Sequence, residues 1–281
     1  MSFDVRPLSD ALGAEIVGLD LSQPLSDDDF AKVHQAHLDH LVIIIRDQKI
    51  TPQHQCDFSE RFGPLMPFSE TQLSVPGYPH MTMISTKREN GEFIGLPDAG
   101  IMWHSDQSFR ETPSLGSMLY ALEVPDEGGN TGFANLYAAY EALPDDLLEA
   151  IDGKNGVFFT GRFREDRPDS GQYKQETRYS PPQHHPMVRT HPETGRKSIF
   201  ANEQHTVGIE GVPDDEAKEI LDQIFTHCER DEFVYWHRWH IGDLTFWDNR
   251  CTVHKADLSR MDDPTYVRHM HRTIIKGSKP V

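Results

Sequence analysis

The pattern of apolar and polar positions along the chain predicts many short strands and few helices. Residues 41–45 form a continuous β-branched apolar run, which is typical of a strand buried on both faces. Apolar residues recur at helical spacing after Ser26, over 138–151 and over 213–227, and Pro52 opens a further short helix. Strands are also expected at 80–85, 116–122, 131–137, 187–190, 197–201, 233–239, 243–247 and 272–275.

The order of these elements indicates a mainly β core with helical additions. No repeat, low-complexity tract or linker divides the chain, so we expect a single domain over residues 1–281. A jelly roll or a barrel is the favoured architecture. The stretches 67–102 and 162–185 are polar and rich in proline, glycine or charge, and we expect them to form loops around a functional site.

Composition restricts the partners of the protein. The 281 residues include 27 Lys and Arg against 45 Asp and Glu, a formal net charge of −18. This argues against nucleic acid and anionic membranes, which attract basic residues, although a small anion can still bind a few buried arginines. Three cysteines without a C-x-x-C pair, and no apolar run long enough to span a bilayer, favour a cytoplasmic setting. Homo-oligomers are common at this size, so we expect a homodimer or homotetramer.

Two histidines and one aspartate are the candidate metal ligands. His104 and Asp106 stand two residues apart, and in a strand such side chains point to the same face. His254 follows an apolar strand much later in the chain. Two imidazoles and one carboxylate on one side of a metal leave open positions, which is the arrangement of non-haem Fe(II) oxygenases. The H-x-D pair alone is a weak signal, but glycine-rich nucleotide-binding and nucleophile-elbow motifs do not occur in the chain.

Seven patterns, two of which contain the candidate ligands, strengthen this interpretation because they occur together and in one order. They are Gly13-Ala14-Glu15-Ile16, Phe62-Gly63-Pro64-Leu65, Trp103-His104-Ser105-Asp106, Gly128-Gly129-Asn130-Thr131, Val188-Arg189-Thr190-His191-Pro192, Trp247-Asp248-Asn249-Arg250 with His254, and Met270-His271-Arg272. On these motifs the chain resembles the taurine dioxygenase and 2,4-dichlorophenoxyacetate dioxygenase (TauD/TfdA) family of Fe(II)/2-oxoglutarate-dependent dioxygenases. The resemblance covers almost the whole chain and implies a double-stranded β-helix, the cupin-like form of the jelly roll.

The resemblance also implies the cofactors and the residues that hold them. It implies three ligands for Fe(II): His104, Asp106 and His254. Thr131 and Arg272 would hold the distal carboxylate of the cosubstrate 2-oxoglutarate, and Arg268 would help because two neighbouring cations favour a shared anion. The implied reaction uses O2 to hydroxylate a small anionic organic substrate and releases succinate and CO2. Asn249 and Arg250 are candidates for orienting the loop that carries the second histidine.

Departures from the family pattern restrict the substrate. In the resembling enzymes that act on taurine, a histidine follows the F-G-x-L turn and an asparagine stands four residues before the first ligand, whereas Phe68 and Gly100 stand here. This argues against taurine itself. Four residues are expected to line a partly apolar pocket: Phe68, Ile101, Met102 and His205. Such a pocket suits an organic acid with an aryl or alkyl group, of the sulfonate or aryloxyalkanoate type.

Two other classes of protein stay open on the residues alone. A zinc hydrolase can use the same two-His-one-Asp site to activate water. Thr131 and Arg272 argue against this alternative, because hydrolysis needs no anchor for a dicarboxylate. A non-catalytic cupin-like binding protein is the second alternative, and the presence of all three ligands argues against it.

Overall fold

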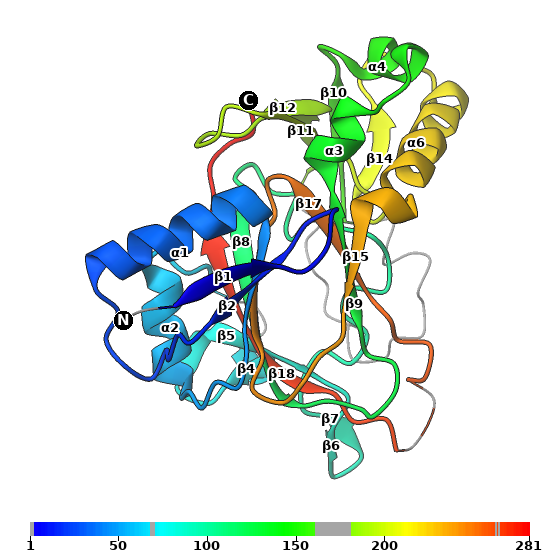
Figure 1. Cartoon of the computed structure of the whole chain (residues 1–281). Coiled ribbons are helices and arrows are strands. Elements are labelled where there is room, and N and C mark those ends of the chain that lie inside the picture. The colour runs from blue at the N-terminus through cyan, green and yellow to red at the C-terminus, as the bar shows by residue number, and fades with distance from the viewer. Residues whose placement is uncertain (1–2, 68–70, 161–180, 262, 264) are drawn as a thin grey trace.

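The computed structural model describes residues 3–67, 71–160, 181–261, 263 and 265–281. Most of its strands belong to two sheets (Figure 1). An eight-stranded sheet has the order β1-β2-β3-β16-β8-β18-β5-β4, and a three-stranded sheet has the order β15-β9-β17. This mainly β architecture is the cupin-like jelly roll that the sequence predicts. Within the described ranges, every helix is too short or too polar to cross a membrane.

The element bounds are as follows. The large sheet contains β1 (Asp4–Pro7), β2 (Ala14–Val17), β3 (Val42–Ile45), β4 (Ser74–Val75), β5 (Tyr78–Ser85), β8 (Ser114–Glu123), β16 (Leu244–Asp248) and β18 (His269–Lys276), and the small sheet contains β9 (Thr131–Asn135), β15 (Val234–His237) and β17 (Thr252–Ala256). Shorter sheets are formed by β6 (Arg88–Glu89) with β7 (Glu92–Phe93), by β10 (Asn155–Phe158) with β11 (Gln183–Pro186) and β14 (Thr206–Ile209), and by β12 (Val188–Thr190) with β13 (Lys197–Ile199). The helices are α1 (Asp27–His40), α2 (Pro52–Glu60), α3 (Leu136–Glu141), α4 (Asp145–Ile151) and α6 (Asp214–Cys228), with single 3-10 turns at Thr71–Leu73 and Asp231–Phe233.

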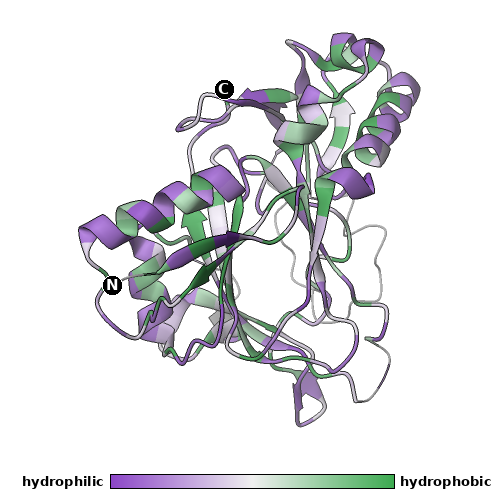
Figure 2. Ribbon diagram, in the orientation of Figure 1, coloured by the Kyte–Doolittle hydropathy of each residue, from purple (hydrophilic) through white to green (hydrophobic). Residues whose placement is uncertain are grey.

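Strand β3 shows how the large sheet is packed. Val42 and Ile44 belong to a hydrophobic cluster that includes Phe133 of the small sheet. Ile43 and Ile45 belong to another cluster, which includes apolar residues of α1 and α2. All four β3 side chains are at most 1% exposed, so the strand is buried on both faces, as its apolar run predicts. Figure 2 shows the corresponding contrast between hydrophobic central strands and the largely hydrophilic outer surface of α1.

The prediction of one continuous helix over 138–151 is wrong. The segment forms two helices, α3 and α4, because Pro144 between them has no N–H to donate within a continuous helix. The strand expected over 131–137 is two residues too long. It ends at Asn135, whose Oδ1 accepts hydrogen bonds from the backbone N–H groups of Tyr137 and Ala138 in the first turn of α3 and so caps that helix.

The two predicted loops also contain regular structure. The stretch 67–102 includes β4, β5, β6 and β7, of which only β5 was expected. Of the stretch 162–185, residues 162–180 lie outside the described residues, and Gln183 begins β11. Strands β5 and β11 pair with β18 and β10, which are distant in sequence, and a local pattern does not reveal such partners. The short strands β4, β6 and β7 pair locally, β4 with β5 and β6 with β7.

His37 is a fully buried polar residue on α1. Its ring stacks on that of Phe246, with 3.8 Å between centroids and 11° between planes. Its Nε2 lies 3.6 Å from the Asp248 carboxylate, but neither ring nitrogen has a hydrogen-bond partner within the described part of the chain. Burial lowers the pKa of His37 to about 3, so the ring is neutral in the folded protein near neutral pH.

We expect the protein to lose stability as the pH falls below about 6.5. Burial also lowers the pKa of His205 to about 3, so His37 and His205 bind protons more readily in the unfolded chain than in the folded protein. The free energy of unfolding should then fall by about 1.4 kcal/mol per pH unit for each of these histidines. Chemical denaturation at a series of pH values measures the slope. His37→Leu should lower the slope by the contribution of one histidine, about 1.4 kcal/mol per pH unit. An unchanged slope would contradict this account.

Candidate metal centre

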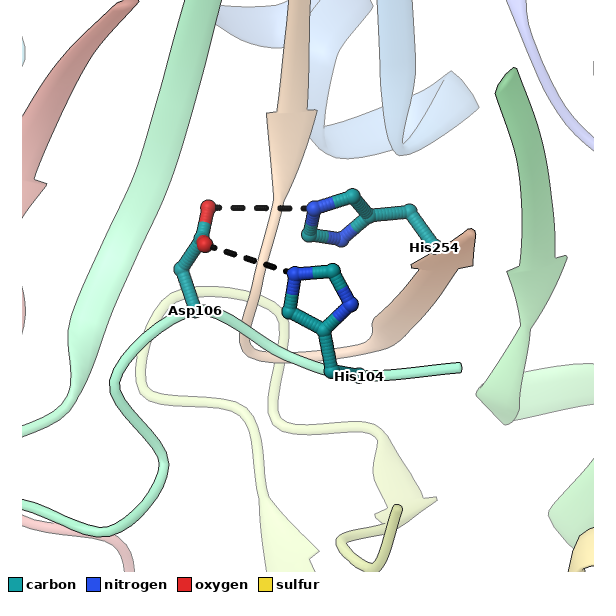
Figure 3. Close-up of side chains that lie close together, drawn as sticks. All are labelled: His104, Asp106 and His254. Atoms are coloured by element: carbon teal, nitrogen blue, oxygen red, sulfur yellow. Dashed lines mark ion pairs between the residues drawn. The ribbon is translucent and has the colours of Figure 1, made fainter. Parts of the chain in front are cut away.

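Backbone pairing brings two of the three predicted ligands together. His254 lies on β17, and His104 forms an isolated antiparallel bridge with it. The His104 N–H donates to the His254 carbonyl at 3.0 Å, and the reverse bond measures 2.8 Å. The sequence analysis expected His104 and Asp106 to lie on one strand. This is wrong, because Asp106 lies in a turn that follows His104. The turn nevertheless points the Asp106 carboxylate towards both imidazoles (Figure 3).

The three side chains have the geometry of a metal site. Asp106 Oδ1 lies 3.7 Å from His104 Nε2, and Asp106 Oδ2 lies 3.9 Å from His254 Nε2. The three ligand atoms all lie within 4.8 Å of one another, and all three residues are buried. Ligand atoms about 2.1 Å from one ion are separated by about 3 to 4 Å, so little adjustment is needed. Two imidazoles and one carboxylate therefore fit a divalent metal such as Fe(II).

Hydrogen bonds and burial keep these groups in the protonation states that bind metal. His104 Nδ1 lies 2.9 Å from the Met102 carbonyl oxygen, so Nδ1 carries the proton and Nε2 keeps its lone pair. Burial, and then the neighbouring His104, lower the pKa of His254 well below its usual value. Burial alone would raise the pKa of Asp106, but Arg272 and the two histidines hold it well below its usual range. The site therefore presents a neutral His254 imidazole, the Nε2 atom of His104 and an anionic carboxylate.

Three residues were predicted from the sequence to hold the cosubstrate: Thr131, Arg268 and Arg272. Arg272, on β18, donates from Nη1 to Asp106 Oδ1 at 3.3 Å. Arg268, just before β18, is 3% exposed, and burial lowers the pKa of its guanidinium. Within the described ranges no carboxylate forms an ion pair with Arg268, and its Nε has no hydrogen-bond partner. Thr131 is buried at the start of β9, and its Oγ1 accepts a hydrogen bond from Trp239 Nε1 at 3.0 Å.

His205 lies beside the candidate ligands. The centroid of its ring is 6.4 Å from that of His104, and its Nδ1 lies 3.0 Å from Ser108 Oγ. Burial, and then the neighbouring His104, lower the pKa of His205 to about 3. His205 is therefore a neutral hydrogen-bonding group rather than a cation.

The other predicted pocket residues stand before the first ligand. Ile101 and Met102 are half-buried in the segment that leads to His104, and Phe68 lies outside the described residues. Gly100 has a φ of +84°, and a Cβ built on it would lie 3.2 Å from His104 Cε1. An asparagine at this position would therefore be strained and would crowd His104.

A second group of potential ligands is a buried ion pair instead. It consists of His191, Asp248 and Cys251. Arg250 donates from Nε to Asp248 Oδ1 at 2.8 Å and from Nη2 to Oδ2 at 2.7 Å. Burial raises the pKa of the Cys251 thiol well above its usual value, so this residue offers no thiolate. A cation would have to displace Arg250 from both carboxylate oxygens, and we therefore interpret the cluster as structural.

The structure changes the expected roles of residues around the second histidine. Arg250 belongs to the buried ion pair just described. Asn249 Oδ1 accepts a hydrogen bond at 3.1 Å from the backbone N–H of Asp106, so it contacts a different ligand from the expected one. Ser117 on β8, which the sequence did not indicate, donates from Oγ to Asp106 Oδ2 at 2.6 Å. The only available signal was one polar residue within the apolar run 116–122.

A jelly roll in which two imidazoles and one carboxylate surround one point defines a class of protein, the non-haem Fe(II) oxygenases. Comparison with protein families refines this result. The family described as "Taurine catabolism dioxygenase TauD, TfdA family" matches residues 4–274. The chain belongs to this family, as its seven motifs predict.

Individual relatives match over nearly the full chain. The chain is 32% identical to the alpha-ketoglutarate-dependent 2,4-dichlorophenoxyacetate dioxygenase of Cupriavidus pinatubonensis, over 91% of this chain and 92% of the relative. A solved structure of a taurine dioxygenase from Burkholderia xenovorans has a TM-score of 0.82 and 31% identity, covering 100% of this chain and 93% of that one. The structure of AAD-2 in complex with Mn(II) and N-oxalylglycine has a TM-score of 0.79 and 28% identity, covering 100% and 99%. These relatives therefore share the whole fold.

Proposed function

We propose that this protein hydroxylates a small organic acid, of the aryloxyalkanoate or sulfonate type, at an iron centre held by His104, Asp106 and His254. The protein is a 2-oxoglutarate-dependent dioxygenase by family, with Fe(II), 2-oxoglutarate and O2 as its cofactor and cosubstrates. The observation that supports the ligand assignment is the convergence of two buried imidazoles and one anionic carboxylate. When bound, Fe(II) supplies the redox chemistry that couples decarboxylation of 2-oxoglutarate, giving succinate and CO2, to substrate hydroxylation.

The residues of the chain position the reactants around this centre. We assign Thr131, Arg268 and Arg272 to the binding of 2-oxoglutarate. Arg268 has the greatest need for an external anion, because it is a buried cation without a carboxylate partner among the described residues. Arg272 already donates to Asp106, so its charge is partly neutralised within the protein. A carboxylate of 2-oxoglutarate bound near Arg268 and Arg272 would neutralise the remaining positive charge of these two guanidinium groups.

Arg268→Leu is expected to weaken 2-oxoglutarate binding by roughly 30-fold or more. Removing one partner of a buried charge pair costs about 2 kcal/mol or more, which corresponds to that change in Kd. Anaerobic titration of the metal-loaded protein with 2-oxoglutarate measures it. Arg61→Leu is the control, because Arg61 pairs with the fully exposed Asp27 on the surface. Equal Kd values for the Arg268→Leu and wild-type proteins would rule out the assignment.

The proposed substrate contacts are His205, Ile101, Met102 and Phe68. His205 is neutral and buried, so it would form a hydrogen bond with the substrate rather than an ion pair. The relative from Cupriavidus acts on 2,4-dichlorophenoxyacetate, an aryl ether of a carboxylic acid, and this supports an acid of similar chemistry here. Succinate release with a panel of aryloxyalkanoates and sulfonates ranks the candidates.

The reaction class has a direct spectroscopic test. Anaerobic addition of 2-oxoglutarate to the Fe(II)-loaded protein should produce a weak visible charge-transfer band, because the 2-oxo acid chelates the metal. O2 and a substrate should then yield succinate. The zinc hydrolase, which the residues alone left open, finds no support among the relatives. Absence of the band from the Fe(II)-loaded protein, together with hydrolysis by the Zn(II)-loaded protein, would restore it.

The wider organisation completes the proposal. We propose one domain over residues 1–281 with active-site loops in the stretches 67–102 and 162–185, a homodimer or homotetramer, and a cytoplasmic location. The expectation of no nucleic-acid or membrane partner rests on the formal net charge of −18. Size-exclusion chromatography with light scattering determines the number of subunits, and limited proteolysis shows whether the chain divides.

A further inference from the structure

Asp106 is held at its side chain and at both of its backbone polar groups. Ser117 Oγ donates to Oδ2 at 2.6 Å, and Ser114 Oγ donates to the Asp106 carbonyl at 2.9 Å. Asn249 Oδ1 accepts from the Asp106 N–H at 3.1 Å. All four residues are buried, so water does not compete for these hydrogen bonds.

Asn249 is the centre of this network. Its Oδ1 also accepts from Trp247 Nε1 at 3.1 Å, and its Nδ2 donates to Ser114 Oγ at 2.8 Å and to Ser117 Oγ at 3.2 Å. The amide thus uses two acceptor and two donor positions, its full capacity. Because each serine oxygen accepts from Asn249, the single hydroxyl proton of each serine is directed at Asp106.

The network connects a ligand on a turn to the rigid centre of the large sheet. Ser114 and Ser117 lie on β8, which pairs with β16 on one side and β18 on the other. Asn249 directly follows β16. Asp106 itself lies in a turn, where the backbone alone fixes a side chain less firmly. The central strands, rather than the turn, therefore determine where the carboxylate lies.

We propose that Ser117 and Asn249 are positioning residues that hold the Asp106 carboxylate ready for the metal. Ser117 fixes the carboxylate directly, and Asn249 acts through Ser114, Ser117 and the Asp106 backbone. This inference rests on the proposed function, in which Asp106 is a ligand. Outer-shell partners of this kind typically change metal affinity by roughly 10- to 100-fold when they are removed.

The test uses Mn(II) binding by the full chain, followed through the electron paramagnetic resonance of the free ion. Ser117→Ala should raise the Mn(II) Kd by roughly 10- to 100-fold, and Asn249→Ala should raise it at least as much. Ser59→Ala is the matched control, because Ser59 is an equally buried serine whose Oγ bonds to Thr273 and to the Gln55 carbonyl. It should lower thermal stability without changing the Kd.

Two results overturn the inference. One is an Mn(II) Kd that Ser117→Ala leaves unchanged, and the other is an equal loss of affinity in Ser59→Ala, which would indicate a general effect of weakened packing. The proposed function fails separately, because in that case Asp106→Ala itself would still bind Mn(II). Thermal unfolding of each metal-free variant establishes that the compared proteins are folded.

Discussion

Asp106→Ala is expected to abolish metal binding and catalysis together. The substitution removes the anionic ligand and leaves Arg272 next to two histidines without its carboxylate, so the site would repel a cation. The Mn(II) Kd should rise by at least about a thousandfold, beyond the 10- to 100-fold range of outer-shell residues. Succinate release with 2-oxoglutarate should fall to background. Metal titration and a succinate assay measure the two effects.

An exposed aspartate provides the control for this experiment. Asp57 lies on α2 and accepts a hydrogen bond from the exposed Gln53, away from the candidate ligands. Asp57→Ala should retain wild-type Mn(II) affinity and succinate release. Normal metal binding by Asp106→Ala would exclude the ligand assignment, whatever the activity of the protein.

Asp248→Asn is expected to destabilise the folded protein by about 3–5 kcal/mol. Arg250 donates to both Asp248 oxygens, and His191 Nε2 lies 3.1 Å from Oδ2, so the neutral amide would leave the buried guanidinium with only the partly exposed Glu193 carboxylate as its anion. Arg250 and His191 hold the pKa of Asp248 well below its usual range, against the effect of burial, which shows how strongly the charged form is stabilised. Chemical denaturation of the metal-free protein measures the change.

Two comparisons make this second prediction specific. Asp222→Asn breaks an exposed i,i+4 pair with Lys218 on α6 and should have little effect on stability, because water solvates both groups. Asp248→Asn should also bind one Mn(II) as the wild-type protein does, since the cluster of Asp248, His191 and Cys251 is interpreted as structural. A lost Mn(II) equivalent would show instead that this cluster holds a metal.

Local sequence signals were sufficient to predict the strand β3 and the helix α1. The apolar run of β3 and the capping serine before α1 are strong signals, and both elements are confirmed. Strand β17 was not predicted, because Thr252–Ala256 has a polar, charged sequence that is extended only through pairing with β9. The hairpin of β6 and β7 was also not predicted, although its turn, Asn90-Gly91, is a strong local signal. Pairing between distant segments determines β17, and it leaves little trace in the local composition.

In the candidate site, too, some residues could be predicted from the sequence and others only from the fold. Spacing and the family motifs predicted the three candidate ligands, His104, Asp106 and His254, because their side chains are chemically distinctive. The structure then places them together. Ser117 has no such signal, because its importance depends on the register that sets it 2.6 Å from Asp106 Oδ2. Asn249 was expected to orient one histidine, and the fold places its amide against the aspartate instead.

The reciprocal backbone bonds between His104 and His254 have a consequence for the energetics of metal capture. The main chain sets the separation of the two imidazoles, so the conformational entropy of bringing these ligands together is lost during folding rather than during metal binding. The site is thus preorganised for any divalent ion of suitable size. Selection of iron then depends on the ligand chemistry and on the supply of metal in the cell, rather than on a rearrangement that only iron could induce.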